Sequence, residues 1–393
     1  MPLRIVIDVR RVKDFGIGTY IRNLVKALAG IDSADHYTLI AEDDFPQEFE
    51  GLPPNFETVL YGIHGWNAAE HLRFPMFLKR QAPDLVHIPL NEVPLLMPKP
   101  YVVTIHDMSS FLFGNRKGIR ENVRLYNFRR GLMRADAVIA VSANTRRDVE
   151  NLLGVPASRI RQVYSAPDPK FFEHNAVSQS EGEAGGDWPG ERRRVLERYQ
   201  IDYPFILYSG RIRPHKNVPR LVEAFAVVKG RLESHPAFKE LRLIIIGDEI
   251  TTHPEVRRAV IQTRMEQCVR FLGFVPFDTL KMFYASASAF IFPSLYEGFG
   301  LPPLEAMASG TPVIASKLSS LPEAVAEAAM LINPENVFDM ARGIEEVLLD
   351  DNLRATLVEQ GYARARQFNW RRTAEQVLEV YREVAQEATR ASH

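Results

Sequence analysis

Phe292-Pro-Ser-Leu-Tyr-Glu-Gly-Phe-Gly-Leu-Pro-Pro-Leu-Glu-Ala-Met-Ala-Ser-Gly-Thr-Pro-Val-Ile-Ala-Ser316 is the stretch that decides the fold of this chain. An apolar run leads into it, glycines tolerate the backbone angles of a tight turn, and prolines open a helix where a missing N–H costs little. The stretch therefore predicts, in order, a strand over Ser288–Phe292, a turn at Gly298 and Gly300, a helix from Pro302 and Pro303 to Gly310, and a strand over Pro312–Ala315.

Two acids bracket this turn, because Glu297 and Glu305 stand with seven residues between them. The N–H groups at a helix start favour an anionic ligand such as a phosphate. Carboxylates repel phosphate but accept hydrogen bonds from hydroxyl groups. A ligand that carries both kinds of group, such as a nucleotide sugar, fits the whole arrangement, whereas an ordinary βαβ crossover would leave both glutamates solvated.

The string from Tyr296 to Ala308 closely resembles the E-x7-E signature of retaining glycosyltransferases of family 4, the group 1 family. The resemblance implies an α/β protein with the GT-B fold, in which two Rossmann-like parallel-sheet domains face each other across a cleft. It also implies a C-terminal helix that crosses back to the first domain. The similarity covers nearly the whole chain and is weakest over Phe45–Gln81 and His174–Arg198.

The composition is that of a soluble globular enzyme with two domains, at 393 residues, 46% hydrophobic and 25% charged. The net charge of −1 argues against nucleic acid as a partner. The single cysteine, Cys268, excludes disulfides within the chain and favours a reducing compartment. The first residues predict a strand rather than a signal peptide, and no apolar run reaches the length of a membrane span. We therefore expect a cytoplasmic protein, with peripheral contact at the inner face of the membrane left open.

Apolar, β-branched runs alternate with helical patterns along the chain, which is typical of parallel sheets wrapped by helices. The predicted strands are Arg4–Val9, Tyr37–Ala41, Leu85–Ile88, Tyr101–Ile105, Ala137–Ala140, Ile160–Val163, Phe205–Ser209, Leu243–Ile246, Val269–Leu272, Ser288–Phe292, Val313–Ala315 and Ala329–Ile332.

A polar, glycine-rich segment over His174–Arg194 favours a domain boundary, although a long surface loop inside one domain would have the same composition. We predict an N-terminal acceptor domain at residues 1–175, a linker at 176–198, a donor domain at 199–368 and a returning helix at 369–393. Asn369 is the predicted N-cap of that last helix.

Cations follow the strand that ends at Gly210, where open α/β sheets bind ligands. Arg211 and Lys216 suit a diphosphate, although a solvated basic loop is the simpler interpretation. The segment resembles the family's Gly-Arg-x-x-Pro-x-Lys-Asn motif, which implies that these two residues stabilise the departing diphosphate. The resemblance also implies that Glu297 contacts the hexose or lies near the reacting face, and that Glu305 holds ribose hydroxyls.

Backbone groups complete the implied donor site. The resemblance assigns phosphate or sugar contacts to the segment Gly298, Phe299, Gly300 and Leu301, and places the loop at Gly247 near the nucleotide. In the first half, Gly16 and Gly18 resemble the glycine loop that lies against the donor phosphate. Ile21 stands where a dinucleotide fingerprint needs its third glycine, which disfavours an NAD-dependent dehydrogenase.

His106 and Asp107 resemble the family's His-Asp pair, which implies that the histidine contacts the donor sugar as a catalytic residue, although a histidine in a strand is commonly structural. Asp107, His87 and Asn91 are candidate acceptor residues. Ser142 is a predicted N-cap. The histidines show no metal-ligand spacing and no Asp-x-Asp motif occurs, so we expect that no metal or other cofactor is required.

A basic run with interleaved aromatic residues extends from Arg116 to Arg134 and includes Arg120 and Arg124. It favours either contact with a carrier-lipid diphosphate or anionic membrane, or simply a solvated helix face. The overall likeness to bacterial mannosyltransferases of polysaccharide and O-antigen assembly predicts transfer of mannose from GDP-mannose to a glycan or lipid-linked acceptor. UDP-glucose or a UDP-N-acetylhexosamine is the alternative donor. A nucleotide-sugar 2-epimerase and a non-catalytic sugar-nucleotide binder are the alternatives of another class.

Overall fold

The computed structural model describes residues 2–14, 16–42, 47–62, 69–90, 93–94, 96–114, 118–173 and 188–391. The candidate residue Asn91 and the start of the basic run, Arg116 and Lys117, lie outside these ranges, and the side chain of Arg120 is also outside the description. The chain forms two compact units. Residues Met1–Ala166 join Phe368–His393 in the first unit, and Pro167–Gln367 form the second.

Within the described residues, the first unit contains a seven-stranded parallel sheet with the order β3-β2-β1-β4-β5-β6-β7. Its strands are β1 (Arg4–Asp8), β2 (His36–Ala41), β3 (Phe56–Leu60), β4 (Leu85–Ile88), β5 (Tyr101–Ile105), β6 (Ala137–Ala140) and β7 (Ile160–Gln162).

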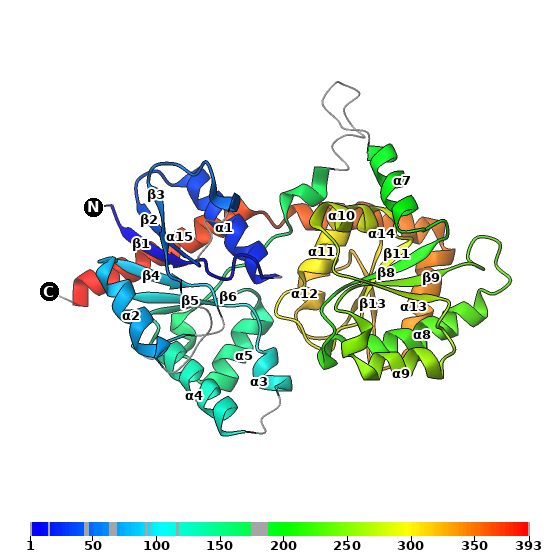
Figure 1. The fold of residues 1–393 in the computed structure, drawn as a ribbon, viewed down its shortest axis with the longest axis horizontal. Coiled ribbons are helices and arrows are strands. Elements are labelled where there is room, and N and C mark those ends of the chain that lie inside the picture. The colour runs from blue at the N-terminus through cyan, green and yellow to red at the C-terminus, as the bar shows by residue number, and fades with distance from the viewer. Residues whose placement is uncertain are drawn as a thin grey trace. The chain divides into compact units, whose positions relative to one another are not determined.

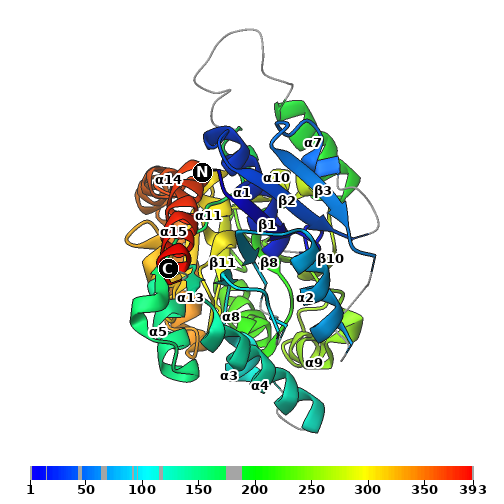
Figure 2. The same cartoon turned by 90° about the vertical axis from the view of Figure 1, so that its left-hand side faces the viewer.

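Helices cover both faces of this sheet. They are α1 (Ile17–Ile31), α2 (Glu70–Arg80), α3 (Ser109–Phe113), α4 (Ile119–Arg134), α5 (Ala143–Leu153) and α15 (Trp370–Ala391), with short 3-10 turns at Gln47–Phe49 and Ala157–Arg159. Figure 1 shows α1 and α15 on one face and α2 and α4 on the other. The C-terminal helix α15 runs beside α1 in both Figure 1 and Figure 2. The predicted return of this helix to the first half of the chain is confirmed.

The described part of the second unit contains a six-stranded parallel sheet with the order β10-β9-β8-β11-β12-β13. Its strands are β8 (Phe205–Gly210), β9 (Arg242–Gly247), β10 (Val269–Gly273), β11 (Ala289–Phe292), β12 (Val313–Ser316) and β13 (Met330–Ile332).

The second sheet is also covered on both faces. Its helices are α7 (Trp188–Arg198), α8 (Val218–Arg231), α9 (Pro254–Gln262), α10 (Phe277–Ser286), α11 (Leu301–Ala308), α12 (Leu321–Val325), α13 (Val337–Leu349) and α14 (Asp351–Arg366), with 3-10 turns at Pro169–Phe172, Pro214–Lys216 and Ile250–Thr252. In Figure 1, α8, α9 and α13 lie on one face and α10, α11 and α14 on the other. The expected class of two Rossmann-like parallel-sheet domains is therefore confirmed.

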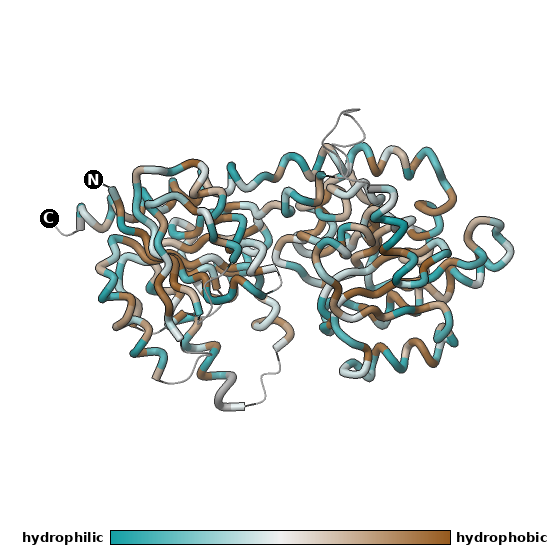
Figure 3. Tube along the Cα trace, turned by 45° about the horizontal axis from the view of Figure 1, so that its top comes forward, coloured by the Kyte–Doolittle hydropathy of each residue, from teal (hydrophilic) through white to brown (hydrophobic). Residues whose placement is uncertain are grey.

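The hydrophobic residues gather in the strands and in the helix stripes that face them. Figure 3 shows hydrophobic colour along the strands of each sheet and hydrophilic colour on the outer helices and loops. In α1, the buried residues Tyr20, Leu24 and Leu28 recur every four positions, which is the spacing of one helix face. Each sheet is buried on both faces, which explains its continuous apolar strands.

Most strand predictions agree with the structure to within one residue, but β3 was missed. Its residues, Phe56–Leu60, are half-buried or exposed at the edge of the sheet, so their sequence lacks the continuous apolar run of the central strands. The predicted caps are confirmed. Ser142 Oγ accepts a hydrogen bond from Thr145 N at 2.9 Å, and the side-chain oxygen of Asn369 accepts one from Arg372 N at 2.9 Å.

The chain passes from the first compact unit to the second between Ala166 and Pro167, and returns to the first between Gln367 and Phe368. The predicted linker at 176–198 lies partly outside the described residues, and its described end is not extended chain but helix α7, which contacts α10 of the second unit. The proposed boundaries at 175 and 198 stay a prediction. Within the described part of the chain, no helix combines the length and apolar content that crossing a bilayer requires.

Candidate functional site

The two motif loops of the second unit meet at the carboxyl ends of neighbouring strands. Since β8 and β11 are adjacent and parallel, the loops that follow them leave the same edge of the sheet. Lys216 Nζ lies 2.6 Å from Glu297 Oε1, although 81 positions separate the two residues. The side chains are 17% and 11% exposed, so this ion pair is largely enclosed but still reachable from solvent.

Asn217 sets the position of Lys216. Its backbone is left-handed, with φ 61°, which ends the 3-10 turn that carries the lysine. Its side-chain amide is buried and donates to the carbonyl oxygens of Pro334 at 2.6 Å and Pro293 at 3.3 Å. A backbone bond from Leu295 N to the carbonyl oxygen of His215, at 2.7 Å, ties the same two loops together. The lysine is therefore held against the loop that carries Glu297.

Arg211 follows β8 directly and is exposed. Its carbonyl oxygen accepts a hydrogen bond from the hydroxyl of Tyr208 at 3.1 Å, which fixes the backbone from which the guanidinium extends. An exposed guanidinium on the loop that also carries Lys216 suits a diphosphate.

Glu305 lies in the second turn of α11, and the residue is half-buried. The hydroxyl of Tyr284 donates to Glu305 Oε2 at 3.1 Å. Burial raises the pKa of Glu305 to about 7, the Tyr284 hydrogen bond opposes this, and the charge of Asp168 adds to it. The carboxyl group therefore changes its charge near neutral pH, which is unusual for a glutamate.

The start of α11 contains the other predicted donor residues. Gly298, Phe299 and Gly300 are buried and Leu301 is half-buried. Gly300 is the N-cap with φ 115°, a value that favours glycine. Pro302 and Pro303 follow Leu301 in the first turn of α11 and have no N–H group. The N–H groups that a ligand could meet at the start of α11 therefore belong to Leu301 and the loop before it.

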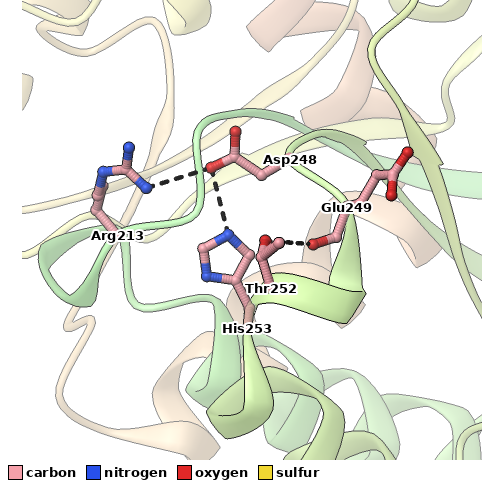
Figure 4. A pocket seen from close by; sticks show the side chains of 5 residues that line it. All are labelled: Arg213, Asp248, Glu249, Thr252 and His253. Atoms are coloured by element: carbon pink, nitrogen blue, oxygen red, sulfur yellow. Dashed lines mark hydrogen bonds and ion pairs between the residues drawn. The ribbon is translucent and has the colours of Figure 1, made fainter.

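An open hollow of about 470 Å³ lies beside the carboxyl ends of β8 and β9. Asp248 Oδ2 accepts a hydrogen bond from Ile212 N at 2.9 Å and lies 3.4 Å from His253 Nε2. Figure 4 shows Asp248 between Arg213 and His253, with the Glu249 carboxylate pointing away from them. The lining residues are Arg213, Asp248, Glu249, Thr252 and His253.

Gly247, a predicted donor-site residue, ends β9 immediately before the lining residue Asp248. Its φ of 144° favours glycine, and so does the close approach of the Gly210 backbone. A Cβ atom on Gly247 would overlap the carbonyl oxygen of Gly210. The ends of β8 and β9 therefore approach each other more closely than side chains would allow. Arg213, which occupies a variable position of its motif, also lines this hollow.

In the first unit, His106 follows β5 and lies against the ring of Tyr20, with centroids 4.8 Å apart and an edge-to-face arrangement. Its Nε2 lies 3.1 Å from the carbonyl oxygen of Pro89, which only accepts, so Nε2 donates and Nδ1 is the acceptor of the neutral ring. Burial lowers the pKa of His106, against the effects of Pro89 and Asp107. The ring is therefore neutral at pH 7.

His87 lies in the core rather than at a surface open to an acceptor. Its side chain is fully buried, Nε2 lies 2.8 Å from Thr104 Oγ1 and Nδ1 lies 2.6 Å from the Tyr381 hydroxyl. Burial lowers the pKa of His87 to about 3, and the neighbouring His106 adds to the effect. In this conformation His87 connects β4 to α15, and its part in acceptor binding has no support from the geometry.

The remaining first-unit candidates lie at loop starts. Asp107 accepts hydrogen bonds from the backbone and hydroxyl of Ser109, at 2.8 and 2.6 Å, and so shapes the turn into α3. Gly16 is the N-cap of α1 with open space beside it, whereas a Cβ atom on Gly18 would overlap the carbonyl oxygen of Val12. Asn91 lies outside the described residues.

Sequence reasoning missed residues that hold the motif loops in place. Asn217 had no assigned role within its motif, and Tyr284 had none at all. Ser319 and Ser320, in the loop after β12, also had none, although both bond to the backbone of Glu297. A serine or tyrosine carries no spacing signal of its own. Among the described residues, no three His, Cys, Asp or Glu side chains are grouped so as to hold a metal ion.

Two family models match the chain. The model described as Glycosyltransferase Family 4 matches residues 16–171, and the model described as Glycosyl transferases group 1 matches residues 192–364. The chain is 28% identical over 391 residues to the O-antigen chain mannosyltransferase B of Escherichia coli, with 93% of this chain and 96% of that protein covered. It is 27% identical to the serotype-specific mannosyltransferase WbdA of Escherichia coli, but spans only 40% of that longer protein.

Solved structures share the fold at lower identity. The sucrose-phosphate synthase of Thermosynechococcus elongatus superposes with a TM-score of 0.74 at 21% identity, over 97% of this chain and 98% of that one. The HepE protein of Anabaena, in complex with UDP and glucose, gives a TM-score of 0.72 at 18% identity, over 97% and 100%. Since the two family models together match most of the chain, and a full-length relative matches both halves, this protein belongs to the group 1 glycosyltransferases of family 4.

Proposed function

We propose that this protein is a retaining hexosyltransferase that moves mannose from GDP-mannose to a hydroxyl group of a glycan or lipid-linked acceptor in polysaccharide or glycoconjugate biosynthesis. The observation that carries the proposal is the contact between Lys216 and Glu297 at the carboxyl edge of the second sheet. Two motifs that are far apart in sequence meet there. Glu305 lies in α11, the helix that follows the Glu297 loop. Relatives that are named mannosyltransferases support the choice of sugar.

In the proposed reaction, Arg211 and Lys216 neutralise the charge that develops on the leaving diphosphate. Such preorganised charges do not need a metal ion, so we propose that catalysis proceeds without one. Glu297 orients the hexose and pairs with the Lys216 ammonium group until the donor binds. Glu305 accepts hydrogen bonds from the ribose hydroxyls. His106, from the first unit, contacts the sugar near its reacting carbon.

The motifs in the sequence offer no convincing carboxylate nucleophile, so we propose a displacement on one face of the sugar. The acceptor oxygen bonds to the anomeric carbon on the face that the diphosphate leaves. The departing phosphate oxygen takes the acceptor proton, and the anomeric configuration is retained.

The choice of guanine rests on the surroundings of the hollow. Glu249 is exposed, and its Cγ lies 3.7 Å from the position of a Cβ on Gly273, against the loop that carries Phe274. Phe274 is 66% exposed, which is unusual for so large an apolar side chain. An exposed aromatic residue and a carboxylate on the loops that follow the neighbouring strands β10 and β9 suit guanine, because its ring N–H and its amino group both donate to a carboxylate. Uracil presents a single ring N–H between two carbonyl groups.

The test is to incubate the protein, with EDTA present, with a panel of nucleotide sugars and an acceptor mixture of lipid-linked and free oligosaccharides. We expect GDP release and an α-mannosyl product by NMR, since the donor is the α-anomer and configuration is retained. Glu249→Gln should weaken GDP-mannose use more than UDP-sugar use, and Glu266→Gln, an exposed glutamate elsewhere, is the matched control. Release of UDP would correct the donor, an altered sugar without any acceptor would indicate an epimerase, and binding without turnover a non-catalytic binder.

We propose in addition that the surface formed by α3 and α4 contacts anionic membrane. On α4, Val123 and Tyr126 are 51% and 61% exposed, and Met133 continues the same helix face. Phe113 of α3 is 43% exposed. Exposed arginines flank these apolar side chains at Arg124, Arg129 and Arg130. Apolar groups that insert and cations that pair with lipid phosphates are the two requirements of interfacial binding.

Vesicle sedimentation tests this surface. Binding to vesicles that contain phosphatidylglycerol should fall at least about thirtyfold in an Arg124→Glu, Arg130→Glu variant, since each basic residue contributes about 1 kcal/mol near an anionic surface and each new glutamate is repelled by it. Arg147→Glu, an exposed arginine of α5, is the control. If the variant and the wild type bind equally, the arginines belong to a solvated helix face.

A further inference from the structure

Two serines from the loop after β12 hold the backbone of Glu297. The hydroxyl of Ser319 accepts a hydrogen bond from Glu297 N at 3.1 Å and donates one to the carbonyl oxygen of Glu297 at 2.8 Å. The hydroxyl of Ser320 is shared between the carbonyl oxygens of Glu297 at 2.9 Å and Phe299 at 3.0 Å. We call Ser319 and Ser320 the serine pair.

The serine pair supports a segment that has no regular secondary structure. Residues 293–300 leave β11 and reach α11 without strand or helix hydrogen bonds of their own. Backbone groups of a loop otherwise bond to water or shift between partners. The N–H and the carbonyl oxygen of Glu297 are instead both bonded to the Ser319 hydroxyl. The backbone from which the Glu297 side chain extends toward Lys216 is therefore held in place.

Ser319 adopts a backbone conformation that is uncommon for a serine. Its φ is 60°, in the left-handed region where glycine is preferred. Strain of this kind persists where the surrounding structure requires it and gathers at functional sites. Glycine would relieve the strain but would lack the hydroxyl group, so the observed residue favours the hydrogen bonds over the relaxed backbone.

We propose that the serine pair positions Glu297, and through it Lys216, for donor binding and transfer. The inference rests on the proposed function of these two residues. Ser319 and Ser320 do not themselves touch the donor in this account, so they are positioning residues. Their effect is to keep the Glu297 carboxylate within hydrogen-bond distance of both Lys216 and the bound sugar. Displacements of about 1 Å in such groups cost as much as a hundredfold in rate.

The test compares Ser319→Gly, Ser319→Ala and Ser320→Ala with Ser286→Ala, a matched control whose hydroxyl bonds only to the carbonyl oxygen of Met282 in α10. Ser319→Ala should melt about 2–4 °C below the wild type, since it keeps the strain and loses the hydrogen bonds. Ser319→Gly should melt closer to the wild type, because glycine relieves the strain. Yet kcat should fall about tenfold or more in both variants, with a smaller change in KM.

The separation of activity from stability is the decisive result, because a merely structural role would make Ser319→Gly the more active of the two variants. Hydrogen exchange gives a second readout that needs no turnover. The Glu297 amide should exchange at least tenfold faster in both Ser319 variants than in Ser286→Ala. Wild-type kcat and unchanged Glu297 exchange in Ser319→Gly would overturn the inference. A wild type that uses no nucleotide sugar would overturn the proposed function, while the exchange data would still decide whether the serine pair holds Glu297.

Discussion

Lys216, Glu297 and Glu305 place opposite charges within one small region of the second unit. The ammonium and carboxylate groups of the first two are in contact and partly accessible, so a bound diphosphate can compete for the lysine. The raised pKa of Glu305 has a different cause, because burial and not a charged partner dominates it. A bound ligand can therefore separate the Lys216–Glu297 ion pair and change the protonation of Glu305.

The sequence could predict these residues because each belongs to a long motif with fixed spacing. It could not predict Tyr284 or the serine pair, because their positions follow from how loops pack. It also could not show that His87 is buried, since a histidine at the end of a strand looks the same whether it faces solvent or the core.

Lys216→Ala tests the proposed charge stabilisation. We expect kcat to fall about 10²–10³-fold, as when one preorganised charge or hydrogen-bond donor is removed from a transition state. Steady-state kinetics with saturating donor measures the change. Lys239→Ala, an exposed lysine in the loop before β9, should behave as wild type. Near-normal turnover of Lys216→Ala would rule out the assigned role.

Glu305 predicts a pH dependence of nucleotide binding. Ribose hydroxyls stabilise the carboxylate more than the carboxylic acid, and the free protein has a pKa of about 7 at this residue. Affinity should therefore rise from pH 6 to pH 7 and level off above pH 7.5. Calorimetric titration across this range measures it, with proton release on binding near pH 7. A Glu305→Gln variant should bind weakly at every pH, and an equally steep rise in that variant would assign the effect to another group.

At the scale of elements, the loops at the carboxyl ends of β8, β9 and β11 form the candidate site, and the rest of the second unit holds those strands in register. Parallel strands buried on both faces have continuous apolar sequences, so their positions could be predicted well. The edge strand β3 could not be, because its half-exposed residues resemble those of a loop. The helix caps at Ser142 and Asn369 were predictable because capping is a local interaction.

Asn217 is the main link between the Lys216 loop and its neighbours. Asn217→Ala should lower the free energy of unfolding by about 1–3 kcal/mol, since two buried carbonyl groups lose their donor and alanine is strained at φ 61°. Asn217→Gly loses the same hydrogen bonds without the strain and should be the milder change. Denaturant unfolding of both variants measures the difference. Equal stability of Asn217→Ala and wild type would contradict the assigned role.

At the scale of the whole molecule, the chain crosses from one compact unit to the other and then returns. Helix α15 completes the first unit, where Tyr381 bonds to the buried His87 and Trp370 packs against Tyr20 with ring centroids 5.7 Å apart. The second unit contains both glutamates and both diphosphate-binding candidates. We therefore expect the second unit to bind the nucleotide and the first unit to depend on the C-terminal helix for its stability.

Tyr381→Phe tests this division. The change leaves the buried Nδ1 of His87 without its hydroxyl partner, which should cost about 1–3 kcal/mol in the first unit. Hydrogen exchange followed by mass spectrometry should show faster exchange in α15, α1 and β4, with the peptides of the second unit unchanged. Nucleotide affinity should also stay at the wild-type value. A loss of nucleotide affinity would show that the two units are coupled in donor binding.

The most direct measurement of the central claim is ligand-induced thermal stabilisation of the wild type by GDP, UDP, ADP and CMP and their sugar conjugates, with EDTA present. A nucleotide that binds only the folded protein stabilises it by about 3 kcal/mol at a concentration of 100 Kd. We predict a clear rise in melting temperature with GDP and GDP-mannose, and a smaller rise in Lys216→Ala, because the lysine contacts the diphosphate. A rise with UDP alone would contradict the proposed donor, and no rise with any nucleotide would contradict the donor site itself.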